Sequence, residues 1–333
     1  MKRKILIIRF SSIGDIVLTS PVIRCVKKQL ENVELHFLVK KNFASIVVSN
    51  PFVDKVIALD QNLSSTIHEL KKEGYSQIVD LQNNLKSLRI KNALGIPCRS
   101  FNKLNIEKWI FVNLKINRLP ALHVVDRYLE TVSEHGVVND GLGLQFFIPQ
   151  EYEVNVNEFV SGAFDKYIGV VIGAAHQTKK MPLHKWKELV SKINEPIIVL
   201  GGKDDFEEGA ALSALAPKRI FNACGQFNLY QSASLIRQSA IVVTHDTGLM
   251  HIAAAFKKPI ISIWGNTVPE FGMYPYYGTL EAKQVIIENK DISCRPCSKI
   301  GYASCPKGHF KCMESQNINQ IVRDIKQMFS SIT

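Results

Sequence analysis

Residues 242–255 read Val-Val-Thr-His-Asp-Thr-Gly-Leu-Met-His-Ile-Ala-Ala-Ala. An apolar run ends in a polar Asp-Thr-Gly turn and a helix-like pattern follows at once, which predicts a strand that feeds a helix. The start of a helix carries free N–H groups and the positive end of its dipole, so this turn suits a phosphate. His251 follows Thr247 by one helical turn, on the same face. An ordinary capped helix with a histidine on its flank would explain the same residues.

The Asp-Thr-Gly triplet also occurs in aspartic proteases. Those enzymes need two copies in an all-β fold, because their chemistry uses paired carboxylates. This chain has one copy, at a strand-to-helix turn. The sequence therefore excludes the protease class.

Strand and helix patterns alternate on both sides of this turn. We expect strands at 4–10, 34–39, 55–59, 77–81, 167–172, 196–201, 240–244 and 259–264, and helices at 17–30, 43–49, 64–73, 86–94, 122–136, 183–193, 205–216, 228–238 and 248–256. Such alternation is typical of a parallel, doubly wound sheet. The periodicity fades over 148–165, as in a linker. The fold class predicted is α/β, with two Rossmann-like domains that face a cleft, and with the sharpest motifs at the carboxyl ends of strands.

Composition is that of a globular protein of two domains: 333 residues, of which 46% are hydrophobic. No apolar run reaches the roughly 18 residues that span a bilayer. The first apolar run is short and is broken by Arg9, so we interpret it as a strand of a cytoplasmic protein and not as a signal peptide.

The net charge of +11 is uneven: residues 1–150 carry a balance of +8 and residues 151–333 a balance of +3. The first half should therefore face an anionic partner, which would be nucleic acid, a membrane surface, or a phosphorylated or carboxylated substrate. A generally basic surface that aids solubility is the alternative.

Several segments, in order, carry a resemblance to a known family. They are Arg-Phe-Ser-Ser-Ile-Gly-Asp-Ile-Val-Leu-Thr-Ser-Pro (9–21), Asp-Leu-Gln-Asn-Asn-Leu-Lys-Ser (80–87), His-Val-Val-Asp-Arg-Tyr (123–128), Thr-Lys-Lys-Met-Pro (178–182), Gly-Gly (201–202) and the Asp-Thr-Gly stretch (246–255). Together they resemble glycosyltransferase family 9, the heptosyltransferases of the lipopolysaccharide inner core.

The resemblance implies a GT-B fold and transfer of heptose, with inversion and without a metal, from ADP-heptose to a hydroxyl of a lipid-linked core. We expect an acceptor-binding domain at 1–155, a donor-nucleotide domain at 165–312, and a C-terminal helix at 313–333 that packs back on the first domain. The expected partners are ADP-heptose, the anionic core oligosaccharide and the inner-membrane surface, with no nucleic acid. The expected location is cytoplasmic, peripheral on the inner face of the inner membrane.

Two residues are candidates for catalysis. Asp15 matches the family's aspartate and would take the proton of the attacking hydroxyl, since inverting transfer needs a base; a helix N-cap is the structural alternative. Lys179 matches the family's lysine at the donor diphosphate, where a compact cation suits the leaving group. The neighbouring Lys180 could take this role, or both lysines could be solvated surface groups.

The resemblance assigns donor binding to Thr178, Lys180, Asp204, Asp246, Thr247, Gly248 and His251. Asp204 would hold the ribose hydroxyls, or else cap the helix at 205–216. This chain departs from the family's pattern: Met181 stands where an aromatic residue is usual, and Ala174, Ala175 and His176 where Thr or Glu is frequent. These departures put individual donor contacts in doubt.

The acceptor would be bound by Ser11, Ser12, Gly14, Lys86, Arg89, His123 and Arg127. Cationic groups make sense there, because a lipopolysaccharide core carries carboxylates and phosphates. Arg127 could equally pair with Asp126 or Glu130 as a structural ion pair.

Seven cysteines are present. Cys25, Cys98 and Cys224 lie in apolar contexts, as buried thiols do. Cys294, Cys297, Cys305 and Cys312 form a C-x2-C-x7-C-x6-C pattern that encloses His309. Four close thiolates can hold a structural zinc ion, while free thiols beneath a loop and a disulfide remain alternatives.

Three other functions remain open. The same fold could use another nucleotide-sugar donor. A basic nucleic-acid-binding protein with a zinc module would explain the charge, although no basic-aromatic motif appears. A catalytically dead binding protein is disfavoured by the presence of Asp15, Lys179 and the Asp-Thr-Gly turn together.

Overall fold

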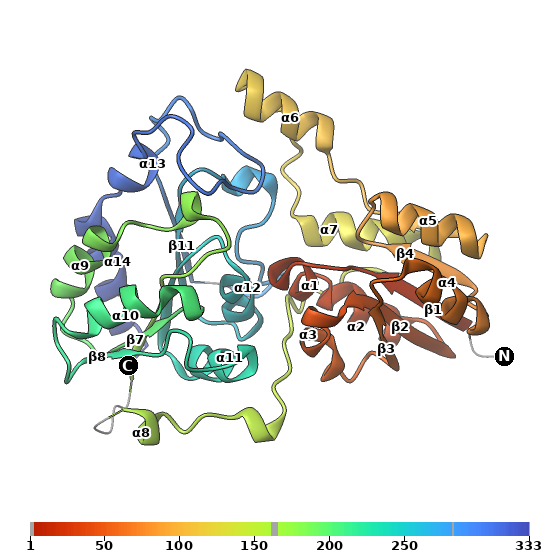
Figure 1. The fold of residues 1–333 in the computed structure, drawn as a ribbon, viewed down its shortest axis with the longest axis horizontal. Coiled ribbons are helices and arrows are strands. Elements are labelled where there is room, and N and C mark those ends of the chain that lie inside the picture. Colours follow the sequence, from red (N-terminus) through yellow and green to blue (C-terminus); the bar gives the residue numbers. More distant parts are fainter. Residues whose placement is uncertain (1–2, 161–165, 282, 333) are drawn as a thin grey trace. The chain divides into compact units, whose positions relative to one another are not determined.

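The computed structural model describes residues 3–160, 166–281 and 283–332, and these form two compact units (Figure 1). The first unit comprises Met1–Leu104, Leu122–Phe147 and Tyr276–Leu280, and the second comprises Asn105–Ala121, Ile148–Pro275 and Glu281–Thr333. Each unit is built on a parallel sheet, which confirms the predicted α/β class.

The sheet of the first unit has the order β3-β2-β1-β4-β5. Its strands are β1 (Arg3–Ile8), β2 (Val33–Lys40), β3 (Lys55–Leu59), β4 (Gln77–Asp80) and β5 (Cys98–Ser100). Their apolar runs are buried because parallel strands are covered on both faces. The strand order reverses between β1 and β4, so the connections that leave these two strands run to opposite sides.

The helices of the first unit are α1 (Ile13–Val17), α2 (Ser20–Gln29), α3 (Ser45–Val48), α4 (Leu63–Lys72), α5 (Leu85–Leu94) and α7 (Val124–Leu129), with 3-10 turns η1 (Lys41–Phe43) and η2 (Glu130–His135). Alternate residues of β1, Leu6 and Ile8, share one core cluster with Leu70 of α4 and Ile90 of α5. Alternation places the other side chains of β1 on the opposite face.

The sheet of the second unit has the order β11-β10-β9-β6-β7-β8 and reverses between β6 and β9. Its strands are β6 (Ile168–Val171), β7 (Ile197–Leu200), β8 (Ile220–Asn222), β9 (Ile241–His245), β10 (Ile260–Trp264) and β11 (Gln284–Glu288). The Asp-Thr-Gly turn follows β9 directly, as the sequence predicts.

The helices of the second unit are α6 (Asn105–Leu114), α8 (Val156–Phe159), α9 (Leu183–Ser191), α10 (Phe206–Ser213), α11 (Leu229–Gln238), α12 (Gly248–Ala255), α13 (Lys311–Glu314) and α14 (Ile318–Ser330), with 3-10 turns η3 (Gln150–Tyr152), η4 (Gln177–Lys179), η5 (Lys203–Asp205) and η6 (Pro269–Phe271). Side chains of α9, α10 and α14 share one core cluster with the sheet, while α12 contacts α11, β9 and β10.

The C-terminal helix corrects one expectation. Ile318, Ile321 and Ile325 of α14 are buried in the core of the second unit, so the apolar face of this helix packs there. The apolar stripe of α14 explains why: it completes the layer that α9 begins against the sheet.

Other boundaries also differ from the expected ones. The helix expected at 17–30 is α2, which begins three residues later and follows the short α1; Pro21 lies in the first turn of α2 as expected, where proline costs no hydrogen bond. The segment 105–121, expected in the first domain, joins the second unit, and 276–280 returns to the first. Part of the expected linker, residues 161–165, lies outside the described residues. No helix of the described chain is long and apolar enough to cross a bilayer.

Candidate functional site

In the first unit Asp15 follows β1, at the point where the strand order reverses between β1 and β4. Its Oδ1 lies 2.7 Å from Nη2 of Arg9, and its Oδ2 accepts hydrogen bonds from the Ser12 backbone N–H (3.1 Å) and hydroxyl (2.7 Å). Ser12 is the N-cap of α1 and Asp15 is its third residue. The cap itself is therefore Ser12, and Asp15 completes a capping box.

Arg9 is buried and ties the Asp15 turn to β4. It donates to the carbonyl of Leu81 (2.6 Å) and to that of Ser11 (2.9 Å). Burial of Asp15 opposes its ionisation, but the charge of Arg9 and the bonds from Ser12 outweigh it, so its pKa lies below the ordinary value. Asp15 is thus held as a carboxylate at neutral pH, with 21% of its side chain exposed. A fixed, ionised carboxylate can accept a proton from a hydroxyl group.

The other residues expected on the acceptor side fall into two groups. Ser11, Ser12 and Gly14 share the Asp15 turn, and Lys86 and Arg89 are exposed on α5. The motif at 80–87 proves to be largely a helix start: Asp80 accepts from the backbone of Gln82 and Asn83, and Asn84 caps α5.

His123 and Arg127 are buried and hold structural positions. Nδ1 of His123 accepts from the backbone of Val125 and caps α7, and its ring lies 4.6 Å from that of Tyr276. The Arg127 guanidinium lies 5.3 Å from the centre of the Phe101 ring. The Tyr276 hydroxyl donates a hydrogen bond to Oδ1 of Asp126 (2.8 Å). The side chains of His123 and Arg127 are both almost completely buried in the structure.

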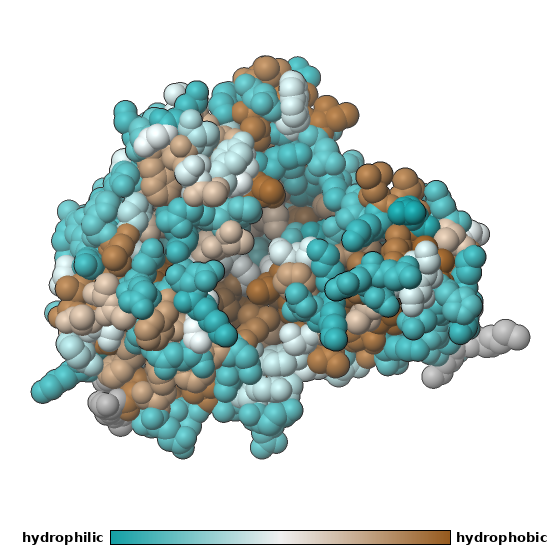
Figure 2. Space-filling model, viewed as in Figure 1, coloured by the Kyte–Doolittle hydropathy of each residue, from teal (hydrophilic) through white to brown (hydrophobic). Residues whose placement is uncertain are grey.

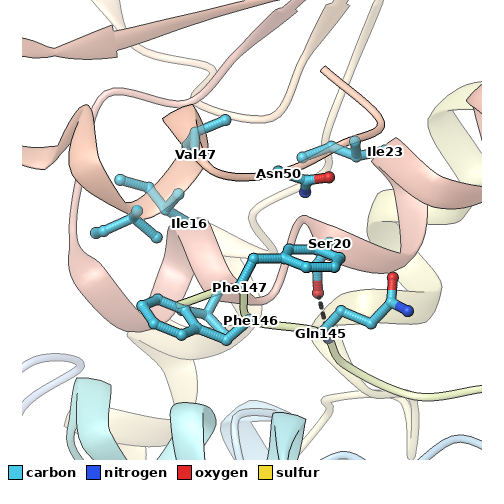
Figure 3. A pocket seen from close by; sticks show the side chains of 10 residues that line it. Ile16, Ser20, Ile23, Val47, Asn50, Gln145, Phe146 and Phe147 are labelled. Atoms are coloured by element: carbon cyan, nitrogen blue, oxygen red, sulfur yellow. Dashed lines mark hydrogen bonds between the residues drawn. The ribbon is translucent and has the colours of Figure 1, made fainter. Parts of the chain in front are cut away.

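A small pocket lies beside α1 and α2 (Figure 3). Its walls are mainly apolar, and Ser20 at its edge accepts a hydrogen bond from the backbone of Gln145 (2.9 Å). Its cavity volume of ≈ 10 Å³ is about what one water molecule needs. The pocket is too small for a sugar.

In the second unit Lys179 and Asp246 meet at the point where the strand order reverses between β6 and β9. Lys179 follows β6 in the turn η4, and its Nζ lies 2.5 Å from Oδ2 of Asp246. Thr267, which follows β10, donates to the same oxygen (3.0 Å). Three neighbouring strands therefore each deliver one polar group to a single point at their carboxyl ends.

The helix α12 begins at the same point. Thr247 is its N-cap and Gly248 its first residue, and both are partly exposed. The Thr247 hydroxyl accepts from the backbone of Met250 (3.4 Å). The free N–H groups of this helix start, next to Lys179, make a site suited to a phosphate. His251 lies one turn along and is buried.

Lys180 does not join this site. Its Nζ lies 2.6 Å from Oδ1 of Asp205 and 3.6 Å from Glu208, and the lysine is buried. Burial lowers the pKa of Lys180 but the two carboxylates outweigh it and raise the pKa above the ordinary value. Lys180 is therefore a structural cation, and of the two lysines only Lys179 is placed for a phosphate.

The sequence left open whether Asp204 binds a ligand or caps a helix, and the structure shows that its neighbour Asp205 holds the structural position. Asp205 is buried, accepts from the backbone of Gly202 (2.7 Å) and precedes α10. A Cβ atom at position 173 would lie 2.3 Å from Oδ2 of Asp205. Gly173 therefore leaves the space that this carboxylate occupies. Asp204 is exposed beside Asp205. The structural role thus belongs to Asp205, which leaves the Asp204 carboxylate available for a ligand.

His245 is a buried neighbour of Asp246 that sequence reasoning did not single out. Its Nε2 accepts from the backbone of Met181 (2.9 Å), which ties the turn after Lys179 to β9. Burial, together with Lys180, lowers the pKa of His245 to about 3. It is neutral at neutral pH, as this acceptor role requires. Sequence reasoning could have identified His245 from its position within the motif at 242–255.

The cysteine-rich segment 294–312 braces both loops of this site. Arg295 donates to the carbonyls of Gly265 and Thr267 (3.2 Å to the latter) and pairs with Glu288 (2.9 Å). On the other side, the Tyr302 backbone N–H donates to the Thr178 hydroxyl (2.8 Å). The buried Thr178 is therefore a loop anchor, and Arg295 fixes the loop that carries Thr267.

The four clustered cysteines are free thiols in the structure. The Cys294 sulfur lies 3.9 Å from Nε2 of His309, but no group of three or more His, Cys, Asp or Glu side chains in the described chain is arranged to hold a metal. Burial raises the pKa of Cys297, and that of Cys312 to about 12, in the metal-free protein. The side chains as arranged do not fit a closed zinc site.

Comparisons with known proteins give one consistent result. Residues 63–306 match the family model described as glycosyltransferase family 9 (heptosyltransferase). Lipopolysaccharide heptosyltransferase 1 of Campylobacter coli is 25% identical over 296 residues, which cover 79% of this chain and 84% of the relative.

Two solved structures share the fold. The ADP-heptose lipopolysaccharide heptosyltransferase II of Escherichia coli aligns with a TM-score of 0.73 at 19% identity, over 99% of both chains. An E. coli heptosyltransferase solved with ADP aligns with a TM-score of 0.65 at 19% identity, over 98% of this chain and 99% of that one. The predicted GT-B type of fold is thereby confirmed.

Proposed function

The chain belongs to glycosyltransferase family 9, the heptosyltransferases, and from that premise we propose that it transfers heptose from ADP-heptose to a hydroxyl of the lipopolysaccharide inner core, with inversion. One observation carries the proposal: Lys179, Asp246 and the start of α12 meet at the carboxyl ends of β6 and β9. These are a cation, a carboxylate and free backbone N–H groups, and a nucleotide sugar offers a matching diphosphate and hydroxyls.

The second unit holds the donor in this proposal. The Lys179 ammonium and the N–H groups of α12 bind the diphosphate, and they stabilise the negative charge that ADP gains as it leaves. Asp246 accepts hydrogen bonds from hydroxyls of the heptose. The exposed Asp204 accepts from the two ribose hydroxyls.

The first unit supplies the base. The acceptor oxygen attacks the anomeric carbon, its proton passes to the carboxylate of Asp15, and the bond from the anomeric carbon to the diphosphate oxygen breaks. Attack opposite to the leaving group inverts the configuration. Lys86 and Arg89, exposed on α5, attract the anionic groups of the core.

No cofactor takes part in these steps. The leaving charge is met by Lys179 and α12, which is the role that a divalent cation plays in metal-dependent transferases. We derive no step from the cysteine-rich segment beyond the support that it gives to the donor loops.

We place the protein in the cytoplasm, peripheral on the inner face of the inner membrane. A lipid-linked acceptor brings the enzyme to that surface, and the net charge of +11 favours an anionic leaflet. Attachment of this kind is electrostatic and weakens with salt.

Thermal stabilisation by nucleotides tests the donor assignment. A ligand that binds only the folded form raises the melting temperature by mass action, so ADP and ADP-heptose should stabilise the protein more than UDP or GDP do. The effect should vanish in Lys179→Ala. A preference for UDP or GDP would keep the fold and overturn the heptose donor; no response to any nucleotide would overturn the donor site itself.

A further inference from the structure

Helix α6 is rich in apolar side chains although none of them is buried. Six of its ten residues are large and apolar, namely Ile106, Trp109, Ile110, Phe111, Val112 and Leu114, and none of the ten is buried. Ile106 is 73% exposed, Trp109 55% and Leu114 56%. An apolar face of this kind marks a site of interaction rather than ordinary surface.

One face of α6 is already occupied within the second unit. The Phe111 ring lies 6.0 Å from the ring of Phe271, and Nζ of Lys108 lies 5.9 Å from the centre of the same ring. Lys115, just after the helix, donates to the carbonyls of Cys294 (3.0 Å) and Pro296 (2.7 Å). These contacts fix the helix and the direction in which its other face points.

The opposite face is the exposed one. At 100° per residue, Trp109 lies about 160° around the helix from Phe111. Hydrophobic side chains gather at the surface over α6 (Figure 2). In the sequence, Lys103 precedes the helix, Arg118 follows it, and Glu107 is the one acidic residue between them.

We propose that α6 docks on the surface of an anionic phospholipid bilayer, with Ile106 and Trp109 at the level of the lipid headgroups. Tryptophan favours that level, and basic residues favour anionic lipid. A helix of ten residues is about 15 Å long, so it lies on a bilayer and does not span it. The inference rests on the proposed function, because a lipid-linked acceptor is what makes this surface useful.

The fluorescence of Trp109 can report directly on whether α6 contacts lipid. The chain has three tryptophans, and the other two, Trp186 and Trp264, are at most 1% exposed. Mixing the full-length protein with vesicles of phosphatidylcholine and phosphatidylglycerol should therefore shift the emission of Trp109 to shorter wavelength, and brominated lipid should quench it. Pure phosphatidylcholine should give a smaller effect.

Variants separate α6 from the rest of the surface. Ile106→Gln/Trp109→Gln should weaken co-sedimentation with the mixed vesicles by at least about tenfold. The matched control is Leu215→Gln/Leu280→Gln, which changes two apolar residues of similar exposure (50% and 44%) outside α6 and should bind like wild type. Equal binding of the α6 variant, or binding without any change in emission, would overturn the proposal.

Activity on two acceptors keeps this inference distinct from the proposed function. The α6 variant should match wild type on a water-soluble, deacylated core acceptor and be slower only on the acceptor in vesicles. If neither protein transfers heptose to the soluble acceptor, the proposed function fails while the vesicle result stands. An emission shift that needs no lipid and grows with protein concentration would assign the face to a second copy of the chain, and would overturn bilayer docking.

Discussion

The ammonium of Lys179 lies 2.5 Å from Oδ2 of Asp246, and this pair joins the loops that leave β6 and β9. Only 16% of the Lys179 side chain and 10% of that of Asp246 are exposed. The two groups hold each other in place without a ligand. A diphosphate that enters between Lys179 and α12 would share the ammonium with Asp246.

Replacement of Lys179 tests this relationship. Lys179→Met should lower kcat/KM by about 10²–10³-fold, because one preorganised cation at a developing charge is worth that much. The fold should survive, since Thr267 still donates to Asp246. Steady-state kinetics with ADP-heptose measures the effect, and a variant with near-normal turnover would refute the role of Lys179.

The neighbouring lysine provides the contrast. Lys180→Met leaves Asp205 buried without its partner, and breaking such a pair costs about 3–5 kcal/mol. We therefore expect a lower free energy of unfolding in denaturant titrations, with ADP affinity of the folded protein little changed. A stable Lys180→Met protein that no longer binds ADP would exchange the roles of the two lysines.

If Asp15 is the base, weakening its hydrogen bonds should shift the pH dependence of kcat/KM. The base must be ionised, so kcat/KM falls as pH drops through its pKa, which Arg9 and Ser12 hold below the ordinary value. Ser12→Ala removes one of these bonds and raises the pKa, so the acidic limb should move up by about half a unit to one unit. An unmoved limb would mean that another group titrates there; loss of activity in Asp15→Ala without unfolding is the companion result.

Arg295 should act on the donor site through Thr267. Lysine cannot reproduce its spread of hydrogen bonds, so Arg295→Lys should raise the KM for ADP-heptose about tenfold, a cost typical of small misplacements. Thr267→Val should act by the same route, and the double variant should be less than additive. Arg219→Lys is the control, because Arg219 also donates to two carbonyls, of Val190 and Glu195, at the β7 side of the sheet. Equal effects of the two lysine variants would reduce Arg295 to a general stabilising residue.

The arrangement of the four clustered cysteines leads to a prediction about the metal content of the purified protein. Because no metal-holding group of side chains is formed in the described residues, protein purified without chelator should hold well below one equivalent of zinc, and EDTA should change neither activity nor melting temperature. One full equivalent, with loss of stability on chelation, would restore the structural zinc that the sequence spacing suggested.

The fold was largely predictable because each sheet is covered on both faces, so its strands are continuous apolar runs between amphipathic helices. Two features of the fold were not predictable from the sequence pattern. Helix α6 and the segment around it looked like part of the first domain, but Phe111 and Lys115 attach to the second unit. The short edge strand β5, only Cys98–Ser100, is too brief to carry a pattern.

The candidate site was predictable where a motif lies at a strand end. Lys179 and Asp246 were named from such motifs and prove to be in contact. Local sequence could not separate Lys180 from Lys179, because the partner of Lys180, Asp205, comes from another loop. Nor could it find Thr267 and Arg295, whose roles arise only when β10 and the cysteine-rich segment pack together.

The most direct test of the central claim is transfer itself. The purified protein is incubated with a lipid-linked inner-core acceptor and, in separate reactions, with ADP-heptose, a UDP-sugar and a GDP-sugar; mass spectrometry measures the acceptor, and NMR the configuration of the new linkage. We predict the gain of one heptose from ADP-heptose alone, with inverted configuration, and its loss in Asp15→Ala. Transfer only from the UDP- or GDP-sugar, or retention of configuration, would contradict the account.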